Sequence, residues 1–151
     1  MKRLQSISAY LLALALLVTS AGPVQARSEK EQERLLIVVL NAHEYRPNKK
    51  VLDKIGPEVN RLLIRIATYH TMRATVRVRA LSSLALYPSN QTRRYLLSLF
   101  HERSLKKSPS GLLLRRQAIR SAARAFRASV IADIITLKTD RNVQIREAVA
   151  H

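Results

Sequence analysis

The chain has 151 residues, of which 47% are hydrophobic, and it carries 27 Lys and Arg against 10 Asp and Glu, a formal net charge of +17. The apolar content argues against a disordered basic tail, and only three glycines and five prolines argue against an all-β protein. No cysteine is present, which excludes disulfides, thiolate metal sites and thiol nucleophiles. We therefore expect one folded, mostly helical, cationic domain.

The first 26 residues have the pattern of a signal peptide. Lys2 and Arg3 precede a short apolar run at 9–18, and the small-residue cleavage pattern VQA follows at 24–26. The run is too short for a membrane span of about 20 residues; the alternatives are a buried N-terminal helix or an uncleaved anchor. We expect an exported protein, periplasmic or secreted, with no transmembrane segment after signal removal. The remainder, 27–151, has 25 basic residues against 10 acidic ones, a net charge of +15.

Helical periodicity dominates the rest of the chain. Ser28 can cap a first helix, because acidic residues at 29, 31 and 33 suit its opening turns. The run LLIVVL at 35–40 also fits a strand, since three of its residues are β-branched. We expect a helical segment at 27–57 and a repeat domain at 58–151. The other expected helices are 50–70, interrupted by Gly56-Pro57, then 73–87, 90–105, 110–126 starting at Ser110 or Gly111, 129–137, and a last one after KTDRN.

One motif recurs three times, at 76–86, 114–124 and 145–151. Each copy has an aliphatic residue followed directly by arginine, and a further apolar residue four positions after the aliphatic one. The arginines are Arg77, Arg115 and Arg146. Repeated helical stripes of this kind must stack on one another to bury their apolar faces.

This motif resembles the second helix of HEAT repeats, and TDRNVQIREAVAH is the closest copy, with Asp140 in its turn. The resemblance implies a short right-handed α-solenoid of antiparallel helix pairs, with about three repeats. It also implies that Arg77, Arg115, Arg146 and Asp140 are structural positions of the repeat. The other two copies lack the acidic residue, which argues against a continuous row of Asp–Arg pairs between successive repeats.

A second set of arginines follows helical spacing on one face. Arg116, Arg120 and Arg124 are four residues apart, and Arg127 follows three later. The row lies about 200 degrees around the helix from the apolar stripe, so it points away from the packing. The HEAT resemblance implies that this row lines a concave groove, together with Arg73 and Arg79. Such arginines suit carboxylate or phosphate partners; the alternative is a solvated basic face.

No pattern indicates catalysis. His43, His70, His101 and His151 lie in different expected elements and lack metal-ligand spacing. The chain has no Gly-x-Ser-x-Gly elbow and no glycine-rich phosphate loop, and its acidic residues are scattered. We therefore expect no catalytic, cofactor-binding or metal-binding residues, and no enzyme.

These observations predict an exported binding module or scaffold for protein–protein interaction in the cell envelope. Its partner would be a protein with an acidic surface, and no specific nucleic acid is expected. The first alternative is a cationic module for anionic envelope polymers or lipid headgroups. A second alternative is an accessory factor, or an enzyme whose site the sequence hides. Self-association through an uncapped C-terminal end is also left open.

Overall fold

The computed structural model describes residues 27–150, so the expected signal peptide at 1–26 and His151 lie outside the described residues. Within that range all regular secondary structure is helical, which confirms the expected all-α class. The helices are α2 (Glu29–Asn41), α3 (Lys49–Asp53), α4 (Val59–Thr68), α5 (Ala74–Leu84), α6 (Asn90–His101), α7 (Pro109–Phe126), α8 (Ile131–Ile135) and α9 (Val143–Ala150), with 3-10 turns η1 (Ser104–Lys107), η2 (Arg127–Val130) and η3 (Thr136–Thr139).

Helix α2 begins where its capping residue predicts. Ser28 Oγ accepts a hydrogen bond from the backbone N–H of Glu31 at 3.3 Å. Leu36 and Leu40, four residues apart, are fully buried, whereas Val38 between them is 61% exposed. The strand alternative for 35–40 is therefore wrong, because the buried residues follow helical spacing and not strand alternation.

The turn between α3 and α4 lies against the N-terminal helix at Gly56. This glycine has a φ of +157° and lies so close to Gln32 that any side chain would overlap that amide. Gln32 is itself buried and donates from Nε2 to the backbone carbonyl of Arg27 at 2.9 Å. Gly56 therefore allows α2 to pack closely on the segment that leads into α4.

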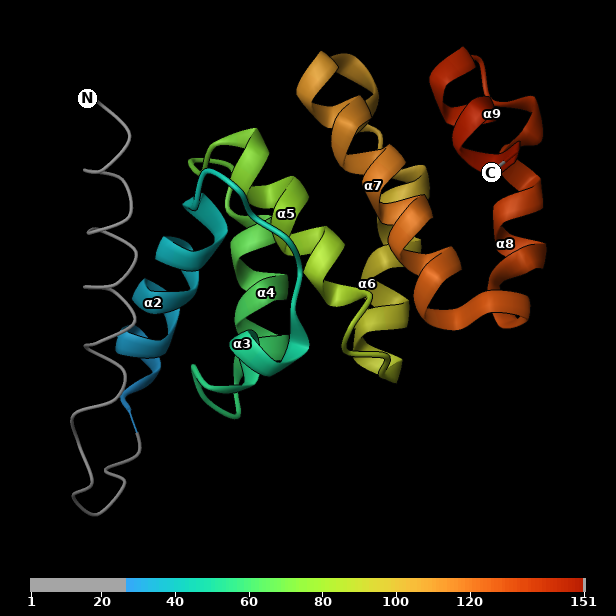
Figure 1. Cartoon of the computed structure of the whole chain (residues 1–151). Coiled ribbons are helices and arrows are strands. Elements are labelled where there is room, and N and C mark those ends of the chain that lie inside the picture. Colours follow the sequence, from blue (N-terminus) through green and yellow to red (C-terminus); the bar gives the residue numbers. More distant parts are fainter. Residues whose placement is uncertain (1–26, 151) are drawn as a thin grey trace, which may run out of the picture.

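The helices lie side by side in chain order, from α2 at one end to α8 and α9 at the other (Figure 1). Helix α4 packs against α5, and α6 packs against α7. The second helices of these pairs also pack together, α5 on α7 and α7 on α9. One continuous core runs through this arrangement, and Leu36 of α2 belongs to it together with Leu81 of α5 and Ile145 of α9.

Three expected boundaries differ clearly from the structure. Helix α7 begins at Pro109, not at Ser110 or Gly111, because Ser108 Oγ accepts a hydrogen bond from the N–H of Gly111 at 3.1 Å and proline suits the first helical position. The segment expected as one helix at 129–137 is divided into η2, α8 and η3. The α6 helix also ends early, at His101, and η1 replaces its expected last turn.

Candidate binding surface

Two arginines of the recurring motif bind the end of the helix that precedes them. Arg77 of α5 donates from Nε to the carbonyl of Ala67 at 2.8 Å. Arg115 of α7 donates from Nε and Nη2 to the carbonyl of Phe100, at 3.0 and 2.8 Å. Ala67 and Phe100 are each the second-last residue of their helix, α4 and α6. Both guanidinium groups thus satisfy a carbonyl that the helix leaves unpaired and oppose its negative dipole end.

Arg115 also reaches the next helix pair. Its guanidinium is 1% exposed and donates from Nη2 to Asp140 Oδ2 at 2.8 Å. Burial raises the pKa of Asp140, but the hydrogen bonds from Arg115 and from the N–H of Asn142 outweigh it, so the pKa lies below its usual value. This carboxylate is therefore held ionised against a buried cation, which fixes the loop before α9 to α7.

The third motif arginine makes a different contact. Arg146 donates from Nη1 to the carbonyl of Asp140 at 2.8 Å and to that of Arg141 at 3.2 Å. Both acceptors lie in the loop directly before its own helix, not at the end of α8. The helix before α9 is short and passes into η3, whose C-cap residue is Asp140, so Arg146 binds the end of a 3-10 turn and not the end of an α-helix.

Arg79 makes hydrogen bonds within the fold, to the end of α2. Its Nη1 donates to the carbonyls of Leu40 and Ala42 at 2.7 and 2.8 Å, at the C-terminal end of α2. The guanidinium also lies 5.5 Å from the centre of the Tyr45 ring. These contacts turn Arg79 toward α2, so the structure does not place it with the arginines of α7.

Arg73 is exposed and precedes the first residue of α5. Ser82 of α5 and Ala85, the C-cap residue of that helix, lie beside Arg120 and Arg124 at the other end of α5. Nine residues of helix separate Arg73 from Ser82, a rise of about 13 Å. Arg73 is therefore also apart from the row.

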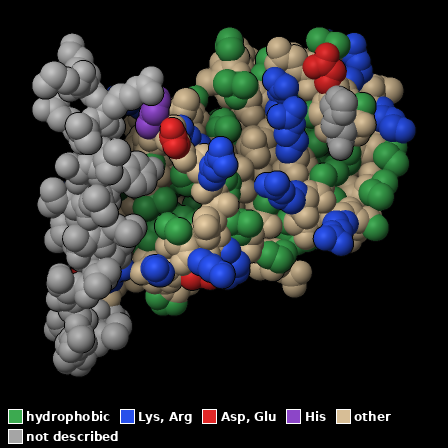
Figure 2. Space-filling model, viewed as in Figure 1, with side chains coloured by type: hydrophobic (Ala, Val, Ile, Leu, Met, Phe, Trp, Pro, Cys, Tyr) green, Lys and Arg blue, Asp and Glu red, His purple; other side chains and the backbone are tan. Residues whose placement is uncertain are grey.

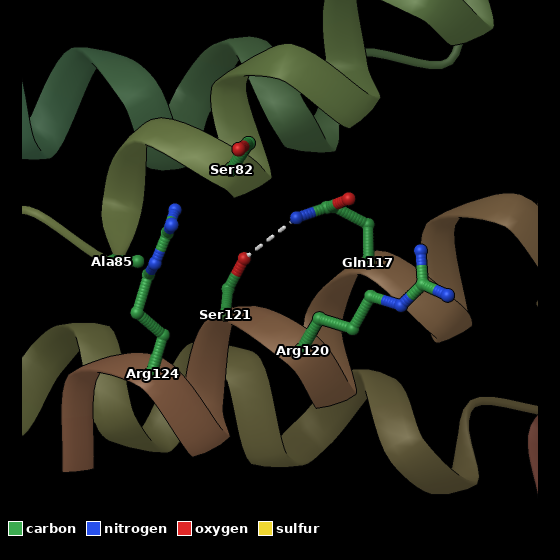
Figure 3. A pocket seen from close by; sticks show the side chains of 6 residues that line it. All are labelled: Ser82, Ala85, Gln117, Arg120, Ser121 and Arg124. Carbon is green, nitrogen blue, oxygen red and sulfur yellow. Dashed lines mark hydrogen bonds between the residues drawn. The ribbon is translucent and has the colours of Figure 1, made fainter. Parts of the chain in front are cut away.

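The α7 arginines border a polar pocket of about 270 Å³ between α5 and α7 (Figure 3). Arg120 and Arg124 line it, and the guanidinium of Arg124 points toward Ala85 while that of Arg120 extends the other way (Figure 3). Gln117 donates from Nε2 to Ser121 Oγ at 3.1 Å, so two polar side chains of α7 lie together at this pocket (Figure 3). We call Arg116, Arg120 and Arg124 the α7 arginine row.

Arg116 extends the row toward α9. It is half-buried, and its Nη1 lies 3.5 Å from Gln144 Oε1 of α9. Its Nε is buried and has no hydrogen-bond partner within the described residues. The row thus runs along α7 from the α9 side to the α5 side.

Within residues 27–150 no carboxylate lies within ion-pair distance of the α7 arginine row. From residue 59 to residue 132 the only acidic residue in the sequence is Glu102. The acidic residues gather instead at α2, where Glu29 and Glu33 pair with Arg65 and where Glu29 also pairs with Arg61. Figure 2 shows basic side chains spread over the face that carries α7, with few acidic ones among them.

Sequence reasoning found the row but missed its polar companions Ser82, Gln117 and Ser121. Gln117 and Ser121 are each three residues before an arginine of the row, so helix spacing alone could have grouped them. Ser82 could not be found in this way, because only the packing of α5 on α7 brings it to the pocket.

The part of the chain that the structure describes holds no group of three His, Asp or Glu side chains able to bind a metal ion. No helix in that part is both long and apolar enough to cross a bilayer. Arg127, expected with the row, instead lines a separate groove beyond the end of α7.

The described residues therefore form an all-α protein with an unneutralised arginine row along one of its central helices. Comparisons of the chain with protein-family models, curated proteins and solved structures found no match.

Proposed function

We propose that this chain is an exported, HEAT-like binding module whose α7 arginine row binds the acidic surface of a partner protein. The observation that carries the proposal is the absence, within residues 27–150, of any carboxylate paired with Arg116, Arg120 or Arg124. Within residues 27–150 only five basic residues form ion pairs, namely Lys49, Arg61, Arg65, Arg93 and Arg115. An acidic partner surface would meet three guanidinium groups here that no carboxylate of the described residues neutralises.

The surroundings of the row support a specific contact over a merely solvated face. Arg124 and Arg120 share their pocket with two hydroxyls and an amide, which can complete the hydrogen bonding of a bound carboxylate. Like charges four residues apart on a helix destabilise it slightly. The contacts of Arg115 offset this destabilisation, because Arg115 bonds to Phe100 of α6 and to Asp140 and so fixes α7 between α6 and the loop before α9.

The HEAT-like part of the proposal rests on a repeated contact. Arg77 and Arg115 occupy matching motif positions and bind matching carbonyls at the ends of α4 and α6. A contact that recurs with the motif is what a stacked repeat array requires, since each unit is held by its neighbours.

A cationic module for anionic polymers or lipid headgroups is the second candidate. It is favoured by exposed basic residues away from the row, namely Arg94, Arg103, Lys106 and Lys107. Diffuse positive charge of this kind attracts any polyanion, and salt steadily weakens that attraction by screening it.

One charge-matched comparison tests both candidates. The row variant carries Arg116→Gln, Arg120→Gln and Arg124→Gln, and the control variant carries Arg94→Gln, Arg103→Gln and Lys107→Gln. Both lose three charges, so net charge alone would weaken them equally. Each chain is used to capture proteins from an envelope extract and to bind anionic phospholipid vesicles, at low and moderate ionic strength.

We expect the row variant to lose a protein that the wild type and the control variant retain at moderate salt, with unchanged helicity by circular dichroism. Equal retention by both variants would refute a specific role for the row. Equal weakening of vesicle binding, without any retained protein, would support the second candidate instead.

A further inference from the structure

A second concave feature lies at the end of the molecule formed by α8 and α9, away from the α5–α7 pocket. It is an apolar groove of about 430 Å³ whose floor includes Ile131, Ile134 and Ile135 of α8 and Val149 of α9. Its rim carries two cations, Arg127 and Lys138. Figure 2 shows hydrophobic side chains beside basic ones at this end of the molecule. We call it the α8–α9 groove.

The floor exposes large apolar side chains to solvent. Ile131 is 51% exposed and Ile135 is 47% exposed, one helical turn apart on the same side of α8. Isoleucine is among the residues most often fully buried in folded proteins. Ile134 and Val149 are partly exposed beside them, so the exposed apolar side chains here lie together and are not scattered singly.

The backbone at the rim is strained. Arg127 has a φ of 49° and a ψ of −125°, and it is the only non-glycine residue with positive φ in the described chain. A long side chain in this region of φ and ψ costs about 1–3 kcal/mol, and such residues cluster at binding sites. The sharp change of direction ends α7 and starts η2, and it places Arg127 at the edge of the groove.

We propose that the α8–α9 groove binds an amphipathic helix of a partner protein, with apolar residues against Ile131 and Ile135 and acidic residues against Arg127 and Lys138. Helix-in-groove recognition uses apolar anchors one turn apart, which is the spacing of the two exposed isoleucines. The cationic rim selects an acidic sequence around those anchors. The inference is independent of the α7 arginine row, because the two sites share no residue.

Charge argues against a second copy of this chain as the occupant. A two-fold contact through the same patch would bring the Arg127 and Lys138 of one copy close to those of the other. Among residues 27–150, no carboxylate lines the groove to offset this repulsion. The chain as a whole carries a formal charge of +17, which adds long-range repulsion between copies.

The test uses the full chain and a labelled peptide of about 16 residues, with leucines on one helical face and glutamates on the other. A second peptide has lysine in place of each glutamate. The groove variant carries Ile131→Gln and Ile135→Gln. The control carries Val38→Gln, which removes one exposed β-branched apolar side chain from α2, far from the groove. Because these residues are exposed, the variants should keep the helicity and melting temperature of the wild type.

We expect the glutamate peptide to bind the wild type and the Val38 control equally, and to bind the groove variant at least about tenfold more weakly. Arg127→Gly with Lys138→Gln should weaken the glutamate peptide and should not weaken the lysine peptide. Binding of both peptides with equal affinity to the wild type, or of the glutamate peptide to the groove variant without loss, would overturn the proposal. So would concentration-dependent dimerisation of the wild type, by sedimentation velocity, that the isoleucine substitutions abolish.

Discussion

Arg115 donates to Asp140 at 2.8 Å while the same guanidinium binds the carbonyl of Phe100, so one buried side chain joins the end of α6 to the loop before α9. The arginine is 1% exposed and the carboxylate side chain 13% exposed. A charge in such a place is stabilising only with its partners present, because removal of either leaves the other unpaired in a poorly solvated site.

We therefore predict that Arg115→Ala lowers the free energy of unfolding by about 3 kcal/mol or more. Asp140→Ala should lower it by less, because the carbonyl of Phe100 still accepts from Arg115. Urea unfolding followed by circular dichroism measures both. Arg146→Ala is the matched control, since its contacts are exposed. An equal loss in all three variants would contradict a special role for the buried arginine.

The same pair predicts how stability changes with acid. The pKa of Asp140 in the folded chain lies below its ordinary value of 3.8. A carboxyl group of lowered pKa contributes stability that is fully present above the unfolded value and is lost as pH falls through the folded value. The stability difference between wild type and Asp140→Asn should therefore be constant near neutral pH and should shrink below about pH 4.

Urea midpoints from pH 7 to pH 2.5, measured on both chains, test this expectation. Glu29, whose pKa is lowered by hydrogen bonds from Arg65 and Arg61, will contribute in the same direction. It is unchanged in Asp140→Asn, so its part cancels in the comparison. A difference that stayed constant down to pH 2.5 would show that the Asp140 charge does not stabilise the fold.

Gly111, in the first turn of α7, gives a prediction in which two effects oppose each other. Helix propensity alone predicts that Gly111→Ala stabilises the chain by about 1 kcal/mol. The added methyl would overlap the backbone carbonyl of Leu105 in η1, and backbone cannot move aside as easily as a flexible side chain. We expect the overlap to win and the variant to be destabilised by about 1–3 kcal/mol.

Thermal unfolding of Gly111→Ala measures the sign directly. Ser110→Ala, at an exposed position of the same turn, is the control and should change stability little. A gain of stability in Gly111→Ala would show that η1 can shift without cost.

How much of this structure the sequence could predict depends on how far apart in sequence the two partners of each interaction lie. Ser28 was identifiable as a helix cap because its bond to Glu31 spans three residues. Ser108 was missed although its bond to Gly111 has the same span, because it lies in the run KKSPSG, whose proline and glycine are also typical of a loop. Local hydrogen bonds are thus readable from sequence when the capping pattern itself is sought.

Contacts between different helices were harder to predict from the sequence than these local hydrogen bonds. Spacing placed Arg116, Arg120 and Arg124 on one face, but nothing in the spacing says which neighbouring helix that face meets. The same limit explains Arg79, whose acceptor at Leu40 is 39 residues away in sequence. A helical wheel assigns a direction to a side chain, and the packing decides whether solvent or another helix lies there.

Arg79 provides the last prediction, because its structural use separates it from the α7 arginine row. We expect Arg79→Met, which keeps the apolar stem and removes the guanidinium, to leave the carbonyls of Leu40 and Ala42 without their donor. Backbone amides of α2 should then exchange faster in hydrogen–deuterium exchange, by about tenfold, while those of α7 change little.

Arg73→Gln is the control, since Arg73 is exposed and begins the same helix. It should leave exchange in α2 unchanged. If Arg79→Met also left α2 unchanged but weakened binding of an acidic partner as strongly as the loss of Arg120, Arg79 would belong to the binding surface after all. Faster exchange in α2 with intact binding would assign Arg79 to the attachment of the N-terminal helix.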